Sequence, residues 1–452
     1  MQLSLAEVQV ATGAQLLAGA SSPIQGDLKI DGWSIDSRTI AKGDLFFAIR
    51  GERMDGHAFV PAVLAQGAVA AIVSEPVPKA NGPLLLVKDT LEALQSLAHW
   101  ARRRWARQIV AVTGSAGKTS TKDIIAALLG VRYRVGKTVG NFNNHIGLPL
   151  SILRLPSDSS VAVLEMGMNH AGEIRDLVAI AEPQFGVITN VGYAHVENFA
   201  SIEDVAAAKR ELIEGISSTA ILNADDPRVA AFAAFHRGHT VTYGFSPSAD
   251  VRAEDAEISA DHARFTVQGV RFETSLSGRH SVSNILAGIA VARIVGIQPH
   301  ELVSAVAALS PGKMRGERKV WRGATVLNDS YNSNPEAAQN MLDVLRSEPA
   351  QRRIAVLGEM RELGQMSEQL HRQVGEYAVK AGIDVVVGIH GAARFLVESA
   401  LQAGAHPRAA LFFDQPDLAG DFLKDFVKSG DAILFKGSRG TQVETALARM
   451  ES

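Results

Sequence analysis

A glycine-rich segment that ends in lysine and threonine carries the most specific chemical pattern in this sequence. It follows an apolar run at 108–112 and precedes a stretch in which apolar residues recur at helical spacing. Such a strand–loop–helix directs backbone N–H groups at phosphate oxygens, while the lysine reaches the terminal phosphates and the hydroxyl holds Mg²⁺. The segment predicts a nucleoside triphosphate site, and its residues are Thr113, Gly114, Ser115, Ala116, Gly117, Lys118 and Thr119.

The match to the common phosphate-loop pattern is incomplete. G-x-x-x-x-G-K-[ST] places a glycine where this chain has Val112. A chance Gly-Lys-Thr turn is the alternative interpretation. The apolar strand pattern before the loop and the helical pattern after it favour the phosphate loop.

Three polar side chains follow neighbouring strand-like runs and are candidates to complete this site. Glu165 ends the apolar run 161–164, and a carboxylate at the carboxyl edge of a parallel sheet can hold Mg²⁺ or simply meet solvent. The small-residue turn after it places His170 near the same rim. His195 follows the next strand, and such a histidine is either a structural residue or a ligand.

Two further features lie on predicted helices. Lys209 stands in the helical stretch 206–211, where local spacing predicts a surface lysine that makes helix-face ion pairs. His280 and Asn284 are four residues apart at a helix start, so they share one face. They are candidates to contact a base or ribose, and capping of the helix is the alternative.

The last third of the chain has two polar turns after strands, at 328–335 and 435–440, and each is a candidate anion or ribose site. Three consecutive arginines, 102–104, could also bind phosphate. For them the favoured interpretation is a solvated helix face that leads into a linker.

The elements that must position these residues indicate an α/β protein of three domains. In 1–106, short strand-like runs are separated by turns and followed by a helix. In 107–311, apolar strands alternate with helices, which predicts a doubly wound P-loop domain, and 251–276 has the polar alternation of an antiparallel extension. The range 312–452 predicts a second, Rossmann-like unit. The expected strands are 44–49, 70–73, 84–87, 108–112, 161–164, 185–189, 219–222, 324–327, 354–357, 384–389 and 432–435.

The amino-acid composition limits the classes of protein to which this chain can belong. The 452 residues suffice for about three domains. Hydrophobic residues make up 46% and charged residues 21%, and a formal net charge of -3 gives no basic field for nucleic acid. The absence of cysteine excludes disulfides and thiolate chemistry. The amino terminus lacks a secretory pattern and apolar runs are too short to cross a bilayer, so we expect a cytoplasmic protein without membrane insertion.

Taken together, these residues resemble the Mur ligase family over nearly the whole chain. The runs 36–38, 43–46 and 55–59 look like the family's uridine-diphosphate-binding domain, and the phosphate loop is the family's form, which accounts for Val112. Narrower likeness is to the members that add D-alanyl-D-alanine. It lies in the runs 140–147, 329–335, 356–364 and 436–440, with Asn328 and Glu359 as departures where an acidic residue and an aspartate are common.

The resemblance implies an ATP-dependent amide ligase, expected to be a monomer, that joins D-alanyl-D-alanine to UDP-N-acetylmuramoyl-tripeptide through an acyl phosphate. It implies two Mg²⁺ ions, the second held through a carbamylated Lys209, with Lys118, His195 and His170 as catalytic candidates. The implied metal ligands are Thr119, Glu165, His195 and Lys209. Outside the loop, the implied nucleotide contacts are His280, Asn284, Arg315, Asp329 and Asn332. The implied substrate contacts are Ser37, Arg38, Phe46, Asn143, Asn144, Asn169, Lys436, Ser438 and Arg439.

Three alternatives stay open at this point. The tripeptide-forming ligase is the nearest, although its Asp-Asn-Pro-Arg motif is absent. A P-loop regulatory NTPase would leave the first segment without a role, and no Asn-Lys-x-Asp guanine motif is present. A purely structural nucleotide-binding module would not need the metal and phosphate candidates that converge from several strands.

Overall fold

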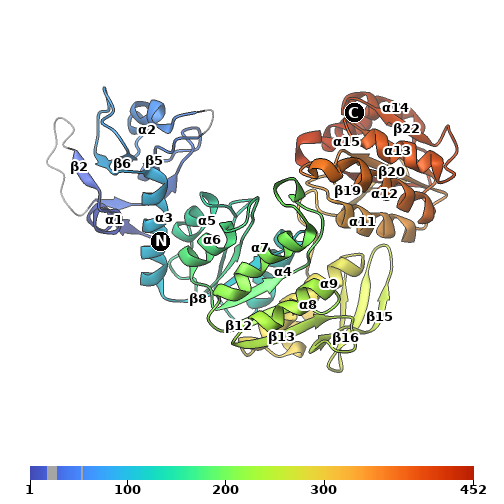
Figure 1. Cartoon of the computed structure of the whole chain (residues 1–452), viewed down its shortest axis with the longest axis horizontal. Helices are drawn as coiled ribbons and strands as arrows, with labels where there is room; N and C mark the ends of the chain where they lie inside the picture. Colours follow the sequence, from blue (N-terminus) through green and yellow to red (C-terminus); the bar gives the residue numbers. More distant parts are fainter. Residues whose placement is uncertain (18–27, 52–53) are drawn as a thin grey trace.

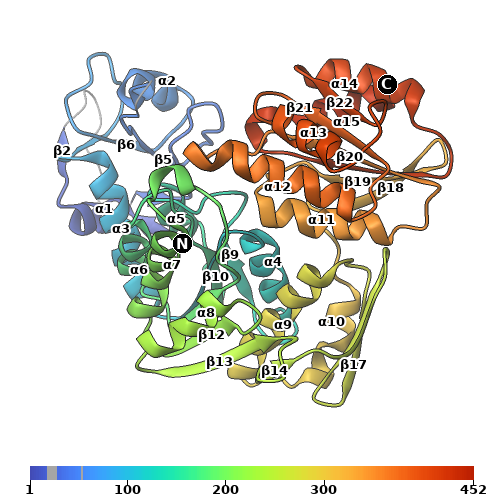
Figure 2. The same ribbon diagram turned by 45° about the vertical axis from the view of Figure 1, so that its right-hand side comes forward.

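The computed structural model describes residues 1–17, 28–51 and 54–452 as three α/β units in chain order (Figure 1). We call them the N-terminal unit (through α3), the central unit (β8 to α10) and the C-terminal unit (β18 to α15). Each unit has its own sheet, and the C-terminal unit lies beside the central unit with α11 on the facing side (Figures 1 and 2).

The N-terminal unit is built on a five-stranded sheet of order β2-β7-β6-β5-β4, parallel except for β2. Its strands are β1 (Leu3–Ser4), β2 (Gln15–Leu17), β3 (Lys29–Ile30), β4 (Gly32–Ser34), β5 (Asp44–Phe47), β6 (Ala70–Val73) and β7 (Leu84–Leu86). Its helices are α1 (Leu5–Thr12), η1 (Gly56–Phe59), α2 (Val60–Ala65) and α3 (Thr90–Trp105).

Helix α3 joins this unit to the next and corrects one expectation. Arg102 is 4% exposed, and its guanidinium donates to the carbonyl oxygens of Ala181 (2.6 Å) and Glu182 (3.1 Å) at the end of α6. The expected solvated face is therefore wrong for Arg102, because its charge satisfies the last carbonyls of a helix in the central unit. It holds for Arg103 and Arg104, whose side chains are largely exposed.

The central unit is built on a seven-stranded parallel sheet of order β14-β13-β12-β11-β8-β10-β9. Its strands are β8 (Gln108–Thr113), β9 (Val135–Lys137), β10 (Val161–Glu165), β11 (Phe185–Ile188), β12 (Thr219–Asn223), β13 (His239–Gly244) and β14 (Val251–Arg252). Its helices are α4 (Lys118–Leu129), α5 (Gly147–Leu153), α6 (Glu173–Ala181), η2 (Val196–Asn198), α7 (Ile202–Gly215), α8 (Pro227–Ala231), η3 (Phe232–Phe235), α9 (Arg279–Ile294), η4 (Pro299–Leu302) and α10 (Val303–Ala307).

The order of these strands places the candidate residues at one edge. Strands β8, β10 and β11 are adjacent and almost wholly buried, as expected for a sheet covered on both faces. The phosphate loop, Glu165 and the segment leading to His195 therefore all leave the carboxyl edge of neighbouring strands, where ligands bind in open α/β sheets.

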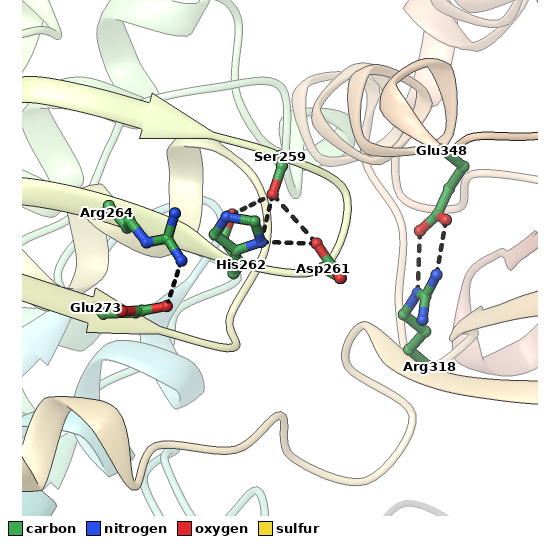
Figure 3. Close-up of polar contacts among 7 residues, drawn as sticks. All are labelled: Ser259, Asp261, His262, Arg264, Glu273, Arg318 and Glu348. Carbon is green, nitrogen blue, oxygen red and sulfur yellow. Dashed lines mark hydrogen bonds and ion pairs between the residues drawn. The ribbon is translucent and has the colours of Figure 1, made fainter.

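An antiparallel extension follows the seven-stranded sheet, as the polar alternation predicts. It consists of β15 (Glu254–Ile258), β16 (Ala263–Val267) and β17 (Val270–Thr274). Arg264 pairs with Glu273 across β16 and β17, and the turn at 259–262 is held by contacts among Ser259, Asp261 and His262. Figure 3 shows this turn facing the C-terminal unit.

Opposite that turn, Arg318 donates two hydrogen bonds to the buried carboxylate of Glu348, at 3.2 and 3.0 Å (Figure 3). The bond to Glu348 raises the pKa of Arg318, and Asp261 of the turn adds to that rise. The antiparallel extension therefore presents an acidic turn to a cationic side chain of the C-terminal unit.

The C-terminal unit has a six-stranded sheet of order β18-β19-β23-β20-β21-β22, parallel except for β18. Its strands are β18 (Glu317–Trp321), β19 (Ala324–Asp329), β20 (Arg352–Gly358), β21 (Val385–Ile389), β22 (Ala410–Phe413) and β23 (Asp431–Lys436). Its helices are α11 (Pro335–Ser347), η5 (Gly364–Met366), α12 (Ser367–Lys380), α13 (Ala393–Gln402), α14 (Pro416–Phe426), η6 (Arg439–Thr441) and α15 (Val443–Glu451).

The predicted fold class is confirmed, and each expected strand is present with ends shifted by at most two residues. Within the described ranges, the helices include none that is both long and apolar enough to cross a membrane.

Replacing Arg102 with alanine is expected to lower the melting temperature by several degrees. The carbonyls of Ala181 and Glu182 would lose a buried donor, which costs about 1–3 kcal/mol, and about 1 kcal/mol shifts the Tm of a domain of this size by roughly 2–4 °C. Thermal unfolding followed by circular dichroism measures the shift. Arg103→Ala is the matched control on the same helix, and equal shifts for the two variants would contradict the capping role.

Candidate active site between the central and C-terminal units

A cleft of about 260 Å³ lies where the phosphate loop meets the C-terminal unit. The central unit contributes the loop and the segment after β11, and the C-terminal unit contributes three turns that follow strands. The lining residues are Ser115, Lys118, Ala194, His195, Asn332, Ser333, Asn334, Arg361, Glu362, Ser438, Arg439 and Gly440.

The phosphate loop has the backbone that its glycines predict. Gly114 has φ +150° and Gly117 has φ +79°, and α4 begins immediately at Lys118. A Cβ at Gly114 would overlap the hydroxyl of Thr189, so both the backbone and the space require glycine there. Lys118 Nζ donates to the carbonyl of Gly114 at 2.7 Å and lies over the loop. Thr119 occupies the first turn of α4.

The position of Val112 in the strand accounts for the absence of glycine there. It is fully buried in β8 and pairs with Glu165 of β10 and Val187 of β11. The loop first leaves ordinary backbone geometry at Gly114, so position 112 belongs to the strand and has no need of glycine.

The turn after β11 supports the loop from behind. The Thr189 hydroxyl donates to the carbonyl of Ala116 at 2.6 Å, and the side chain of Asn190 accepts the N–H of Ala116 at 2.9 Å. Ser115 N–H also donates to the Asn190 carbonyl at 3.0 Å. Thr189 and Asn190 were not among the predicted site residues, although polar residues at a strand's carboxyl end are the signal that identifies them.

Lys118 is the electrostatic centre of the cleft. Burial lowers the pKa of its ammonium, and nearby Arg315 lowers it further, while Glu165 and Glu362 act in the opposite direction. The central and C-terminal units thus contribute one carboxylate each to balance this charge.

Glu165 has the features of a cation ligand. It is 2% exposed, its Oε1 accepts a hydrogen bond from Asn143 Nδ2 at 2.8 Å, and its backbone N–H donates to Thr138 Oγ1 at 3.0 Å. Its Oε2 is buried without a hydrogen-bond partner in the described part of the chain. A buried carboxylate oxygen left unpaired is costly, so a ligand that supplies a positive charge fits this position. The alternative prediction, that the charge of Glu165 simply meets solvent, is wrong because this side chain is buried.

Lys209 is not the surface lysine that local spacing predicts. The expected surface lysine is 1% exposed, so the ion-pair prediction is wrong. Burial lowers its pKa well below the ordinary value, and the charge of Lys118 lowers it further. Helix α7 directs the Lys209 side chain inward. The spacing of residues in this segment alone resembles that of a solvated helix face.

His195 contacts a residue that sequence analysis did not single out. It has a left-handed φ of +61°, and its Nδ1 lies 2.6 Å from Glu362 Oε2, without hydrogen-bond alignment. The contact with His195 lowers the pKa of Glu362. Glu362 lies in the run 356–364 that carried the family resemblance, but nothing local to it indicated a partner in another domain.

The loop that carries Arg361 and Glu362 is held from both sides. Ser438 Oγ accepts the N–H of Arg361 at 2.9 Å, and His371 Nε2 of α12 accepts the N–H of Met360 at 2.9 Å. Burial lowers the pKa of His371, which favours the neutral ring that this acceptor role requires. Ser438 is thus a support for the cleft wall, while Arg439 is exposed and pairs with Glu444.

At the start of α9, Asn284 accepts a hydrogen bond from the Thr121 hydroxyl at 3.0 Å and lies against Gly117. The capping interpretation is wrong, because Gly278 is the N-cap and no side chain caps the helix. Burial lowers the pKa of His280, with Asp329 raising it and Lys436 lowering it. His280 therefore faces charged groups of the C-terminal unit.

Four predicted residues of the C-terminal unit form one group. Lys436 is 2% exposed, and its ammonium donates to Asp329 Oδ2 at 2.5 Å and to the carbonyl of Asn332 at 3.0 Å. Arg315 stacks on the ring of Tyr331 at 4.0 Å. Lys436 thus orients Asp329 and the 329–332 turn, and its predicted contact with substrate stays a prediction.

The remaining predicted residues lie elsewhere. Arg38 pairs with Asp36 at the surface near Ser37, whereas the ring of Phe46 is 1% exposed in the core of the N-terminal unit. Asn144 Oδ1 accepts the N–H of Gly147, the first residue of α5. Asn169 and His170 contact Glu173 in an exposed turn. Their roles toward substrate stay predictions, and no described contact brings His170 to the cleft.

This arrangement suits phosphoryl transfer to a carboxylate. A glycine loop at a helix N-terminus, a buried lysine and an unpaired carboxylate oxygen hold a triphosphate and its counter-ion. The C-terminal turns close the opposite side with Arg361 and the 332–334 segment. Such a two-walled site is typical of an enzyme that uses a nucleoside triphosphate.

Comparisons with known proteins agree with this class. Three family models match in order: Mur ligase family, catalytic domain (29–102), Mur ligase middle domain (112–292), and Mur ligase, glutamate ligase domain (314–439). UDP-N-acetylmuramoyl-tripeptide–D-alanyl-D-alanine ligase of Bacillus subtilis is 37% identical over 95% of this chain and 95% of its own. The enzyme of that name from Escherichia coli is 35% identical over 97% and 98%. The chain belongs to the Mur ligase family.

Solved structures give the same result. MurF from Acinetobacter baumannii superposes with a TM-score of 0.89 at 29% identity, covering 100% of this chain and 99% of its own. MurF ligase from Thermotoga maritima in complex with ADP has a TM-score of 0.82 at 30% identity, covering 93% and 97%. The chain therefore shares its three-unit architecture with these MurF structures.

Gly114→Ala is expected to weaken ATP binding by about tenfold or more, equivalent to about 1.4 kcal/mol. The added methyl group collides with Thr189 and forces the loop away from its phosphate-binding backbone. Isothermal titration calorimetry with ATP measures the loss. Gly269→Ala is the control, because that glycine also has positive φ but no neighbour within 4 Å of an added Cβ. Unchanged affinity in Gly114→Ala would refute the loop assignment.

Proposed function

We propose that this chain joins D-alanyl-D-alanine to the terminal carboxylate of UDP-N-acetylmuramoyl-tripeptide, with ATP converted to ADP and phosphate. The observation that carries the proposal is the cleft in which Lys118 of the phosphate loop faces Arg361 and Glu362 of the C-terminal unit. Two relatives named UDP-N-acetylmuramoyl-tripeptide–D-alanyl-D-alanine ligase match 95% and 97% of the chain. One similar MurF structure was solved in complex with ADP.

The proposed reaction has two steps. An oxygen of the tripeptide carboxylate attacks the γ-phosphorus of ATP, the bond to the β-phosphate oxygen breaks, and ADP leaves. The amine of D-alanyl-D-alanine then attacks the acyl carbon, and phosphate leaves as the amine loses its proton. Phosphorylation is needed because a free carboxylate is a poor electrophile.

This chain's residues position and neutralise the reactants. The amides of the phosphate loop and Lys118 offset the repulsion between the carboxylate and the triphosphate. Arg361 adds a cation from the opposite wall of the cleft. Asp329, fixed by Lys436, and Asn284, fixed by Thr121, are placed to orient the nucleotide.

Glu165 and Thr119 are the residues that would hold Mg²⁺. The unpaired Oε2 of Glu165 provides an oxygen ligand of the kind Mg²⁺ prefers. When bound, Mg²⁺ neutralises charge on the phosphate oxygens. In the described ranges, no group of three or more His, Cys, Asp or Glu side chains forms a metal cluster. Phosphate oxygens of the nucleotide would supply further ligands to this ion.

Lys209 suits the carbamate that our proposal assigns to it. A neutral amine is needed for attack on CO₂, and the lowered pKa of Lys209 favours the neutral form of the amine. The product is an anion, which removes the repulsion from Lys118 and creates an attraction. The carbamate and His195 are proposed to help hold a second Mg²⁺.

We also propose that the monomer is the active form. We propose a cytoplasmic location, because ATP and nucleotide-linked precursors are cytoplasmic substrates.

Phosphate release from ATP is expected to require both UDP-N-acetylmuramoyl-tripeptide and D-alanyl-D-alanine. A coupled phosphate assay with each substrate omitted in turn measures this requirement. Steady hydrolysis that neither substrate changes would instead support a regulatory NTPase. Release on addition of a single amino acid to the UDP-linked dipeptide would support the tripeptide-forming ligase. Running the lysine-containing and diaminopimelate-containing tripeptides side by side identifies the acceptor.

Lys209→Ala is expected to lose at least about a hundredfold in ligation rate and to regain part of it with formate or acetate, which replace the missing carboxylate. In parallel, unaltered protein equilibrated with ¹³C-bicarbonate should show a carbamate carbonyl resonance that Lys209→Ala lacks. Lys380→Ala, which removes an exposed lysine of α12, is the control. A fully active Lys209→Ala variant would eliminate the carbamate proposal.

A further inference from the structure

The segment 191–193 makes an unusual set of contacts. Three consecutive backbone N–H groups donate to side chains of three different parts of the molecule. Val191 N–H donates to Asp226 Oδ2 at 2.7 Å, Gly192 N–H to Ser115 Oγ at 2.8 Å, and Tyr193 N–H to Glu336 Oε1 at 2.9 Å. The acceptors lie in the turn before α8, in the phosphate loop and in α11 of the C-terminal unit.

The connection to the phosphate loop is reciprocal. Ser115 Oγ accepts from Gly192 N–H and donates to the Gly192 carbonyl at 2.9 Å. Two residues farther along, Ala194 and His195 line the cleft. A shift of this backbone would therefore move both the loop and His195.

Glu336 reaches this segment from the C-terminal unit. It stands in the first turn of α11, directly after the turn that contributes Asn332 and Asn334 to the cleft. Its carboxyl group fits against Gly192, where an added Cβ would lie 2.5–2.8 Å from Cδ and both oxygens. Its Oε2 is buried and has no hydrogen-bond partner in the described part of the chain.

A purely structural role does not account for the free-energy cost of burying the carboxylate of Glu336. Burial raises its pKa, with the nearby Asp226 raising it further, while the Tyr193 N–H lowers it. A buried carboxylate beside another carboxylate is retained at a free-energy cost. An apolar side chain of this size would pack the same interface without that cost, so the hydrogen bond to the segment is the feature that distinguishes Glu336.

We propose that Glu336 is a positioning residue that transmits docking of the C-terminal unit to the phosphate loop through the backbone of residues 191–195. When α11 docks, Glu336 fixes Tyr193, and Gly192 then fixes Ser115. The ligation-rate part of its test rests on the proposed function, whereas the docking part does not.

The docking measurement uses the natural absence of cysteine. Spin labels at Val131→Cys in the central unit and Leu418→Cys in the C-terminal unit, both exposed positions, report the distance between the units by double electron–electron resonance. It is recorded with ATP alone. Glu336→Ala is expected to broaden the distribution toward longer distances. Glu336→Gln keeps Oε1 as an acceptor and is expected to match the unaltered side chain.

The rate measurement compares the same variants in the full-length enzyme. For Glu336→Ala we expect kcat to fall about tenfold, as the loss of one buried hydrogen bond predicts, with KM for D-alanyl-D-alanine changed less than threefold. Glu336→Gln should retain at least half of kcat. Asn340→Ala, at an exposed position of the same helix, is the matched control. If Glu336→Ala does not fold, Glu336→Asp replaces it, because it keeps the charge and shortens the reach.

Three outcomes would overturn the proposal. An unchanged distance distribution in Glu336→Ala would show that docking does not depend on this contact. A fall in kcat without a change in distance would separate the rate from docking. Equal damage in Glu336→Gln and Glu336→Ala would show that the acceptor is not what matters. If the unaltered protein does not ligate, the proposed function fails, and the distance measurement still decides the docking role.

Discussion

The charge of Lys118, which is half-buried in the cleft, is the constraint on which the active-site architecture depends. A cation removed from water must find compensating charge or lose its proton. Here the compensation comes from the Gly114 carbonyl and from Glu165 and Glu362, which belong to different units. A bound triphosphate would supply more negative charge than these groups together. The charge balance of the loop therefore couples nucleotide binding to the position of the C-terminal unit.

The same charge acts on Lys209. Lys209 is buried in the field of the Lys118 ammonium, and both burial and that charge lower the pKa of Lys209 well below its ordinary value. Lys118 has Glu165 and Glu362 to favour its charged form, while Lys209 has no such carboxylate among the causes of its shift. The surroundings therefore favour the charged form more at Lys118 than at Lys209.

The sequence predicted what depends on local pattern. Buried parallel strands are continuous apolar runs, so the sheets and the phosphate loop were accessible without coordinates. Lys209 and Arg102 were misjudged because helical spacing does not reveal which segments, distant in the sequence, pack on a helix. Glu362 and Asn190 were missed for a related reason, since their partners lie far along the chain. The family resemblance indicated Lys209 as a site residue, because a resemblance carries information that residue spacing lacks.

The two outer units are attached to the central unit in different ways. Helix α3 packs along α5 and α6, and Arg102 and Arg154 donate to backbone carbonyls across that junction. The C-terminal unit meets the central unit chiefly where η5 touches η2, and through single side chains such as Glu336 and Glu362. A junction made of a few polar contacts opens at a lower free-energy cost than a packed helix interface. The C-terminal unit is therefore the one that can move, and its few contacts end on the segment that supports the phosphate loop.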